Sequence, residues 1–164
     1  MNDTVGVFHF ERDFSSSLRC IPMAVRFKLD LCGIKLSLRQ WNRFLPEERV
    51  QLLESPCDSS TEVQGYRRQL LDLVSLRTGQ VAEELPIEAH PAWNDVAHVP
   101  EQVKEYAVAR ELPQPTAEQW AALSALQRFT LLKLSRAKHD NVNFGPAMHE
   151  FGLAQAVRRS PSVS

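Results

Sequence analysis

Two segments of the chain repeat each other at a constant offset, and this repeat constrains the fold more strongly than composition does. The segments are SLRQWNRFLPEERVQLL (residues 37–53) and TAEQWAALSALQRFTLL (residues 116–132). The matching positions, which include Trp41 and Trp120, are separated by 79 residues. Self-similarity at this scale indicates a repeated supersecondary unit. The repeat therefore predicts an internal duplication in which the tryptophans anchor the core.

Both copies carry the same signals for the start of a helix. Each has a Ser or Thr three residues before a Gln, the spacing of a capping box in which side chain and backbone groups pair reciprocally. The paired residues are Ser37 with Gln40, and Thr116 with Gln119. A second helix start follows at Pro46 in the first copy and at Ser124 in the second. We therefore expect a short helix and then a longer helix in each copy.

The stretch LRCIPMAVRFKLDLCG, which precedes the first copy, is ambiguous by itself. Apolar and charged residues alternate from Val25 to Leu31, as in a half-buried strand, and a hairpin is one interpretation. Pro22 and Gly33 instead fit the start and the end of a helix. The stretch before the second copy, VPEQVKEYAVARELPQP, has helical spacing and no alternation. If the copies share a fold, residues 22–32 form a helix.

These signals together predict an all-α fold, a single compact helical domain over residues 1–153 built on a duplicated three-helix unit. The expected parts are repeat units at 22–54 and 101–138, and a connecting helix at 61–78 that begins with a capping box of Thr61 and Gln64 and ends at Gly79.

The remaining segments have weaker signals. Residues 80–99 are expected to form a polar loop that Trp93 holds in place. A short helix is expected around PAMHEFG, with Asn143 or Gly145 as its cap. Residues 154–164 are expected to be a disordered tail.

Charge and composition exclude some classes of protein. The formal net charge is −1, so the clustered basic surface that binds phosphate backbones is not expected, and neither is a nucleic-acid partner. The first residues, MNDTVGVFHFERDF, have early acidic residues and no long apolar run, which argues against a signal peptide or a membrane span. We expect a cytoplasmic protein with no membrane partner, whose three cysteines remain thiols.

The cysteines, Cys20, Cys32 and Cys57, are low-probability candidates for a metal site. At about 1.5 Å per residue, the predicted helix separates Cys20 from Cys32 by roughly 15 to 18 Å, too far for both to bind one metal ion. Cys57 could approach either one, with a histidine as a further ligand, but no CxxC pattern supports this. Buried free thiols are the favoured interpretation, so no metal or other cofactor is expected. Because no nucleophile motif is present either, we expect no enzymatic activity.

Polar residues gather in QRFTLLKLSRAKHDNVNFGPAMHEFG, at the end of the last long helix. Cations that complement the helix dipole and asparagines that cap helix ends account for much of this pattern. Their density beside an aromatic residue also suits a surface that binds an acidic partner. The candidate residues for partner binding are Arg136, Lys138, His139, Asn141, Asn143 and Phe144. Arg49 and Arg128, which are equivalent in the repeat, could instead tie helix ends together within each unit.

Four strings carry a resemblance to a known family. They are FHFERDF, LRCIPMAVRFKLDLCGIKLSLRQW, PCD and LQRFTLLKLSRAKHDNVNFGPAMHEFG. From about Phe8 to Leu153 the chain resembles the nitrate reductase-associated protein family of small bacterial proteins encoded with assimilatory nitrate reduction genes. The resemblance includes the three cysteine positions and implies no catalytic residues.

The resemblance implies an accessory or maturation factor that binds assimilatory nitrate reductase, a molybdenum and iron-sulfur enzyme, and is needed for its activity. It does not imply that this protein binds those cofactors. Two alternatives stay open at this point: a metal or iron-sulfur carrier that uses cysteine and histidine, and a regulatory binding module with a helix pair like a DNA-reading motif. Self-association is left undecided.

Overall fold

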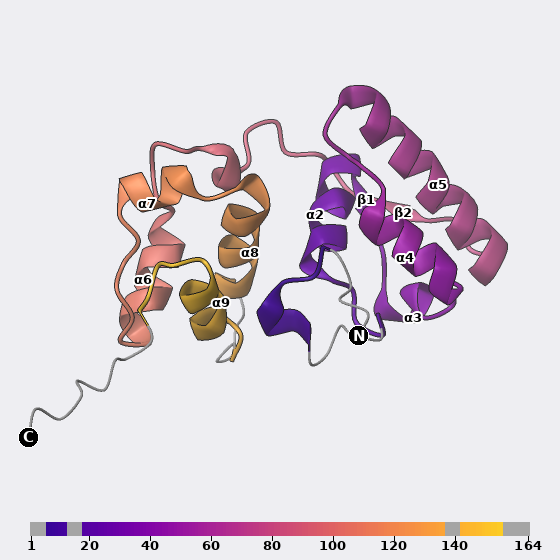
Figure 1. Cartoon of the computed structure of the whole chain (residues 1–164). Coiled ribbons are helices and arrows are strands. Elements are labelled where there is room, and N and C mark those ends of the chain that lie inside the picture. The colour runs from indigo at the N-terminus through magenta and orange to yellow at the C-terminus, as the bar shows by residue number, and fades with distance from the viewer. Residues whose placement is uncertain (1–5, 13–17, 137–141, 156–164) are drawn as a thin grey trace, which may run out of the picture. The chain divides into compact units, whose positions relative to one another are not determined.

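A computed structural model of the chain describes residues 6–12, 18–136 and 142–155. Its contacts divide the chain into two compact units, Met1–Ala89 and His90–Ser164. Most described residues are helical, with one two-stranded sheet (Figure 1). The all-α prediction is confirmed, whereas the single domain over residues 1–153 and the internal duplication stay predictions.

The first unit is built around α2, which α4 and α5 contact, while α3 packs on α5. In chain order its elements are η1 (His9–Glu11), α2 (Met23–Cys32), β1 (Ile34–Lys35), α3 (Leu38–Trp41), α4 (Pro46–Glu54), α5 (Ser60–Thr78) and β2 (Glu83–Glu84). Its most deeply buried apolar residues include Val25, Ile34, Trp41, Leu52, Leu70 and Val74. The apolar stripe of each helix thus faces a shared core.

The ambiguous stretch is a helix, as the repeat predicted, and not a hairpin. Pro22 is the N-cap of α2, one position before the first helical residue, and Gly33 ends the helix with a left-handed φ of 71°. The carboxylate of Glu11, which is 1% exposed, accepts a hydrogen bond of 2.8 Å from the backbone N of Met23. A negative group at this end stabilises the helix dipole, and the hydrogen bond occupies an otherwise free N–H.

A short antiparallel sheet follows Gly33, where the sequence predicted no strand. Ile34 lies opposite Glu84, and Lys35 lies opposite Glu83. The N–H of Leu85 also donates to the carbonyl of Gly33 at 2.8 Å. These strands are far apart in the sequence, so local periodicity does not reveal their pairing.

The connecting helix, α5, begins earlier than predicted, at Ser60. Its capping box consists of Ser59 and Glu62: Ser59 Oγ accepts from Glu62 N at 3.1 Å, and Ser59 N donates to Glu62 Oε1 at 2.9 Å. The predicted pair, Thr61 with Gln64, was therefore wrong. A carboxylate in the first turn also complements the helix dipole, which a Gln cannot do. The predicted end is confirmed, since Gly79 has a left-handed φ of 68°.

A bidentate ion pair joins α4 to α5. Arg77 Nε lies 3.0 Å from Glu48 Oε1, and Arg77 Nη2 lies 3.1 Å from Glu48 Oε2. Glu48 also accepts a hydrogen bond of 2.8 Å from the backbone N of Leu45, just before α4. The hydrogen bonds from Arg77 and Leu45 hold the pKa of Glu48 below its ordinary value, although burial opposes them. One carboxylate therefore caps α4 and fastens it to α5.

We expect Glu48→Gln to remove part of the pH dependence of stability. Because the folded state lowers the pKa of Glu48, its contribution is present above the unfolded value of about 4.3 and is lost as pH falls through the folded value. Chemical unfolding of wild type and variant between about pH 3 and pH 7 measures this. The difference should be about 1 kcal/mol at pH 7 and should vanish at the acid end. A constant difference at every pH would contradict this account.

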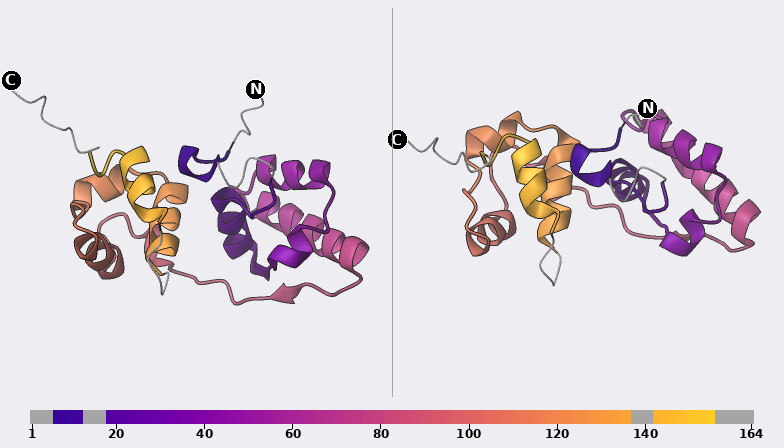
Figure 2. Two further views of the ribbon diagram at one scale, coloured as in Figure 1. Left: turned by 90° about the horizontal axis from the view of Figure 1, so that it is seen from below. Right: turned by 60° about the horizontal axis from the view of Figure 1, so that its bottom comes forward.

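The second unit is arranged around α8, which contacts η2, α6 and α9. Its elements are η2 (Ala92–Asn94), α6 (Glu101–Ala109), α7 (Ala117–Ala122), α8 (Ala125–Ser135) and α9 (Phe144–Glu150). Figure 2 shows α9 beside α8. The fully buried side chains include Val103, Ala107, Trp120, Leu131, Phe144 and Met148. The predicted capping box at Thr116 is present, and the helix start predicted at Ser124 is a capping box with Gln127.

In the first unit, a tryptophan and an arginine of the repeated segment hold the chain ahead of α2. Trp41 Nε1 donates to the carbonyl of Leu18 at 2.6 Å, and Arg49 Nη1 donates to the same carbonyl at 3.0 Å. Trp41 is fully buried, as predicted for a core anchor. The pair therefore positions the segment that leads into α2.

The equivalent residues of the second unit hold the chain ahead of α6. Trp120 Nε1 donates to the carbonyl of Asp95 at 2.8 Å, and Arg128 Nε donates to the carbonyl of Trp93 at 2.7 Å. Arg128 Nη1 also donates to the carbonyl of Leu123, at the end of α7. The expected structural role of Arg128, tying a helix end, is confirmed.

Candidate partner-binding surface

The predicted partner-binding segment joins α8 to α9. Arg136 is the C-cap of α8, and its backbone N donates to the carbonyl of Lys133 at 3.2 Å. Asn143 is the N-cap of α9, and its carbonyl accepts from Ala147 N at 3.0 Å, although its side chain makes no capping hydrogen bond. Three candidates, Lys138, His139 and Asn141, lie outside the described residues.

Phe144 belongs to the core of the second unit. Its side chain is fully buried, and its ring lies edge-on to Tyr106 of α6, with centroids 4.7 Å apart. The guanidinium of Arg110 lies 3.3 Å from the centroid of the Tyr106 ring, in a cation–π contact. Phe144 was expected at the surface, but it instead fixes the start of α9 against α6. It can position neighbouring residues without touching a partner itself.

Arg136 is the described candidate that is exposed to solvent. Lys133 stands three residues earlier on α8, so the two cations share one side of the last turn. Neither takes part in an ion pair with another described residue. Cations in a last turn complement the helix dipole, as the sequence predicted. Their charge is also available to a carboxylate of another protein.

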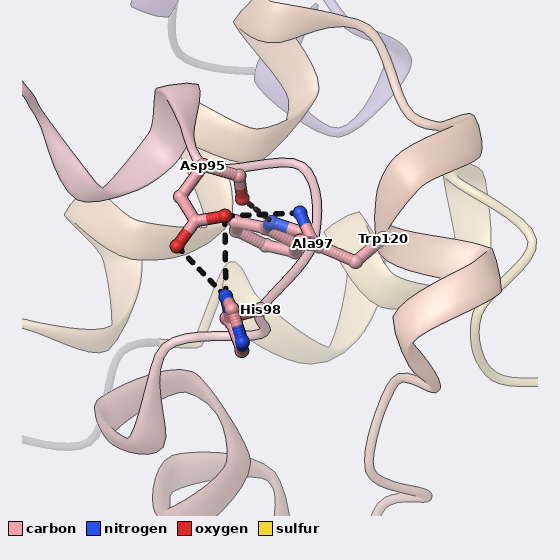
Figure 3. Close-up of polar contacts among 4 residues, drawn as sticks. All are labelled: Asp95, Ala97, His98 and Trp120. Carbon is pink, nitrogen blue, oxygen red and sulfur yellow. Dashed lines mark hydrogen bonds and ion pairs between the residues drawn. The ribbon is translucent and has the colours of Figure 1, made fainter.

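The loop before α6 is held by contacts that the sequence did not reveal (Figure 3). The Asp95 carboxylate accepts from Ala97 N at 3.0 Å, and Asp95 Oδ2 lies 3.1 Å from His98 Nδ1. These contacts, led by that of Ala97, lower the pKa of Asp95. Trp120 holds the same residue through its backbone carbonyl. The predicted anchor was Trp93; the structure adds Trp120 and Arg128, which bind carbonyls of this loop.

The Asp95–His98 pair resembles, in its residue types, the catalytic pairs in which a carboxylate orients a histidine. The side chains are 51% and 81% exposed, and the Asp95 carboxylate is already engaged by a backbone N–H within the turn. Catalytic pairs work in sites that exclude water and hold a third group in place. This pair therefore supports a loop structure rather than a reaction.

Two of the three cysteines are buried thiols in the first unit. Cys32 is 1% exposed and Cys57 is 5% exposed, while Cys20 is half-buried, and all three are free. Burial, helped by the neighbouring Cys57, raises the pKa of Cys32 to about 11. Burial also raises the pKa of Cys57. Thiols with raised pKa values are poor nucleophiles and poor metal ligands at neutral pH, because both roles need the thiolate.

The described residues contain no group of three or more His, Cys, Asp or Glu side chains that could hold a metal ion. Near Cys57, the ammonium of Lys28 donates to the carbonyls of Leu53 at 2.7 Å and Ser55 at 2.6 Å. The hydroxyl of Tyr66 donates to the carbonyl of Leu52 at 2.9 Å. Polar groups around the thiols therefore cap the end of α4. In the sequence, Lys28 was only one of the charged residues that alternate with apolar ones from Val25 to Leu31, and its contacts with these carbonyls could not be predicted.

Within the described residues, no helix is long and apolar enough to cross a membrane.

Comparison with known proteins identifies the family of the chain. Neither the curated proteins nor the solved structures contain a match to the chain. Residues 7–151 match the family described as conserved nitrate reductase-associated protein, close to the extent of the resemblance in the sequence. The chain belongs to the conserved nitrate reductase-associated protein family.

Proposed function

We propose that this protein is a non-enzymatic accessory factor that binds assimilatory nitrate reductase and supports its maturation in the cytoplasm. Membership of a nitrate reductase-associated family over residues 7–151 is the observation that carries the proposal. The match covers both compact units rather than a short motif, so the family assignment applies to the chain as a whole. Binding is proposed because the family's description names association with nitrate reductase.

The α8–α9 segment supports this proposal as one contact surface. Arg136 and Lys133 present positive charge at the end of a helix whose other side chains are largely buried. Phe144 fixes the far end of the segment in the core. Because α8 is held by its buried side chains, Arg136 at its end loses little backbone freedom on binding, which favours affinity. Asn143 belongs to the proposed surface too, and Lys138, His139 and Asn141, which lie outside the described residues, remain candidates from the sequence.

The proposal predicts that purified protein binds nitrate reductase and prefers the form without its cofactors. A maturation factor must bind the immature enzyme more tightly, and a tenfold preference corresponds to about 1.4 kcal/mol. Isothermal titration calorimetry with cofactor-free and cofactor-loaded reductase, side by side, measures both affinities. Absence of binding to either form would refute the docking function, and equal binding would refute the maturation role.

Arg136→Ala tests the surface within the same titrations. Loss of a partner carboxylate contact should weaken binding about tenfold, because such contacts are worth roughly 1 to 2 kcal/mol. Arg68→Ala on α5 is a matched control, since Arg68 is also exposed and forms no ion pair with another described residue. Equal affinities of the two variants would remove Arg136 from the surface.

A further inference from the structure

The short helix α3 and the turn into α4 expose large side chains beside a rigid core. Trp41 and Phe44 are 0% and 2% exposed and hold this segment to the first unit. Leu38 and Leu45, by contrast, are 49% and 44% exposed. Removing such apolar area from water is favourable, so a partner that covers it gains affinity. Residues 38–45 therefore present two apolar side chains that the unit itself leaves largely uncovered.

Two arginines occupy the same segment. Arg39 lies in α3 and Arg43 lies in the turn that follows it, and both are exposed. Neither arginine appears in the ion pairs formed within the described residues. The positive charge of this segment is thus not paired within the described part of the chain.

The second repeat shows what this segment needs in order to fold. Its helix α7 has the same capping box, formed by Thr116 and Gln119, and the same buried tryptophan, Trp120. At the offset of 79 residues, the counterparts of Leu38, Arg39, Arg43 and Leu45 are Ala117, Glu118, Ala122 and Ser124. A capped helix with a buried tryptophan therefore forms without large apolar or cationic side chains at these positions. Folding of the first copy therefore does not require them, which leaves these exposed side chains free for binding.

The backbone beneath these side chains is held from several directions. Ser37 Oγ accepts from Gln40 N at 3.1 Å, and Gln40 Oε1 accepts from Ser37 N at 3.0 Å. Asn42 Nδ2 donates to the carbonyl of Leu38 at 3.0 Å, and the indole of Trp41 donates to the carbonyl of Leu18. A surface that is ordered before binding avoids much of the entropic cost of association.

From these observations we propose that Leu38, Arg39, Arg43 and Leu45, termed the α3 patch, form a docking site for an acidic segment of a partner protein. Guanidinium groups bind carboxylates in a bidentate manner, and arginine beside apolar side chains is typical of protein interfaces. The exposed leucines and the net charge of −1 favour a protein over a nucleic acid. This inference deepens the proposed function and rests on it, because the reductase is the first partner to test.

The test compares charge reversals inside and outside the patch. Arg43→Glu and Arg68→Glu make the same change at exposed positions of the first unit, and the double variant R39E/R43E reverses the whole charge of the patch. Calorimetry against nitrate reductase should show about tenfold weaker binding for Arg43→Glu, a larger loss for R39E/R43E, and less than about a twofold change for Arg68→Glu. Circular dichroism and chemical unfolding should be unchanged, since these side chains are exposed.

A second probe keeps this test independent of the reductase. Isotope-labelled protein is titrated with a synthetic peptide in which glutamates alternate with leucines, and backbone NMR signals are followed. Shifts concentrated at residues 37–45, and absent in R39E/R43E, are expected. If wild type binds the reductase, equal affinities of Arg43→Glu and Arg68→Glu would overturn the patch and leave the proposed function intact.

If wild type does not bind the reductase, the proposed function fails and the peptide decides the patch. Shifts at 37–45 would then support it, and shifts elsewhere or none would overturn it. Sedimentation of the free protein covers one further occupant: self-association that R39E/R43E abolishes would identify the patch as a contact between copies of this chain and overturn the proposal. Binding of single-stranded DNA that depends on the patch would overturn it as well.

Discussion

Replacing Gly33 by Ala is expected to lower the free energy of unfolding by about 3 kcal/mol. Gly33 ends α2 with φ at +71°, a conformation that costs an L-residue about 1 to 2 kcal/mol. A Cβ at this position would also lie 2.8 Å from the carbonyl oxygen of Leu85 and 2.9 Å from Ile87 Cγ1. The oxygen belongs to backbone that already hydrogen-bonds Gly33, so it cannot move away without loss of that contact.

Gly79→Ala is the matched control. Gly79 ends α5 with nearly the same backbone conformation, φ at +68°, but a Cβ at that residue would extend into open space, with nothing within 4 Å. Only the conformational cost applies, and we expect a loss of about 1 kcal/mol. Chemical denaturation of both variants measures the two effects. Equal losses would show that the contact between Gly33 and the segment around Leu85 relaxes freely.

Arg128→Ala is expected to destabilise the protein by about 3 kcal/mol. Arg128 is 7% exposed, and its guanidinium binds the carbonyls of Trp93 and Leu123. Burial lowers the pKa of this guanidinium. The two carbonyl oxygens that it binds stabilise its positive charge in part. Truncation removes both contacts and leaves a cavity beside η2, so the loop ahead of α6 loses its attachment to α8.

Arg49→Ala, at the equivalent position of the first unit, provides the comparison. Arg49 is half-buried and donates a hydrogen bond to the carbonyl of Leu18, which Trp41 also binds. We expect a loss of about 1 kcal/mol. Arg128→Lys should recover little stability, because a single ammonium does not reproduce the planar fork that reaches two carbonyls. A smaller effect at Arg128 than at Arg49 would contradict the anchoring role.

Local signals predicted the helices well because they act over three or four residues. The Ser37–Gln40 and Thr116–Gln119 capping boxes are present as expected, since each forms between neighbouring groups. Ser59 with Glu62 was missed because a second pair of suitable residues, Thr61 with Gln64, stands two positions later. Choosing between them depends on the charge of the Glu at the helix start.

The candidate surface was predicted less completely, because composition does not distinguish exposed residues from buried ones. Arg136 is exposed, as a contact residue must be, whereas Phe144 packs on Tyr106 in the core. The burial of Phe144 depends on the position of α6 beside the start of α9, which only the tertiary structure shows. The α3 patch was missed for the opposite reason: Leu38 and Leu45 resemble core residues in the sequence, yet the core is already filled by Trp41 and Phe44.

The sequence by itself determined the helical class, the repeated helix starts and the family, because capping, periodicity and matching strings are properties of neighbouring residues. Only the tertiary structure decided which residues meet across long stretches of chain. It placed Gly33 against Leu85, Arg128 against the loop before α6, and Cys32 near Cys57. These contacts depend on how the helices pack within each unit, and packing is settled by the shapes of all the buried side chains together.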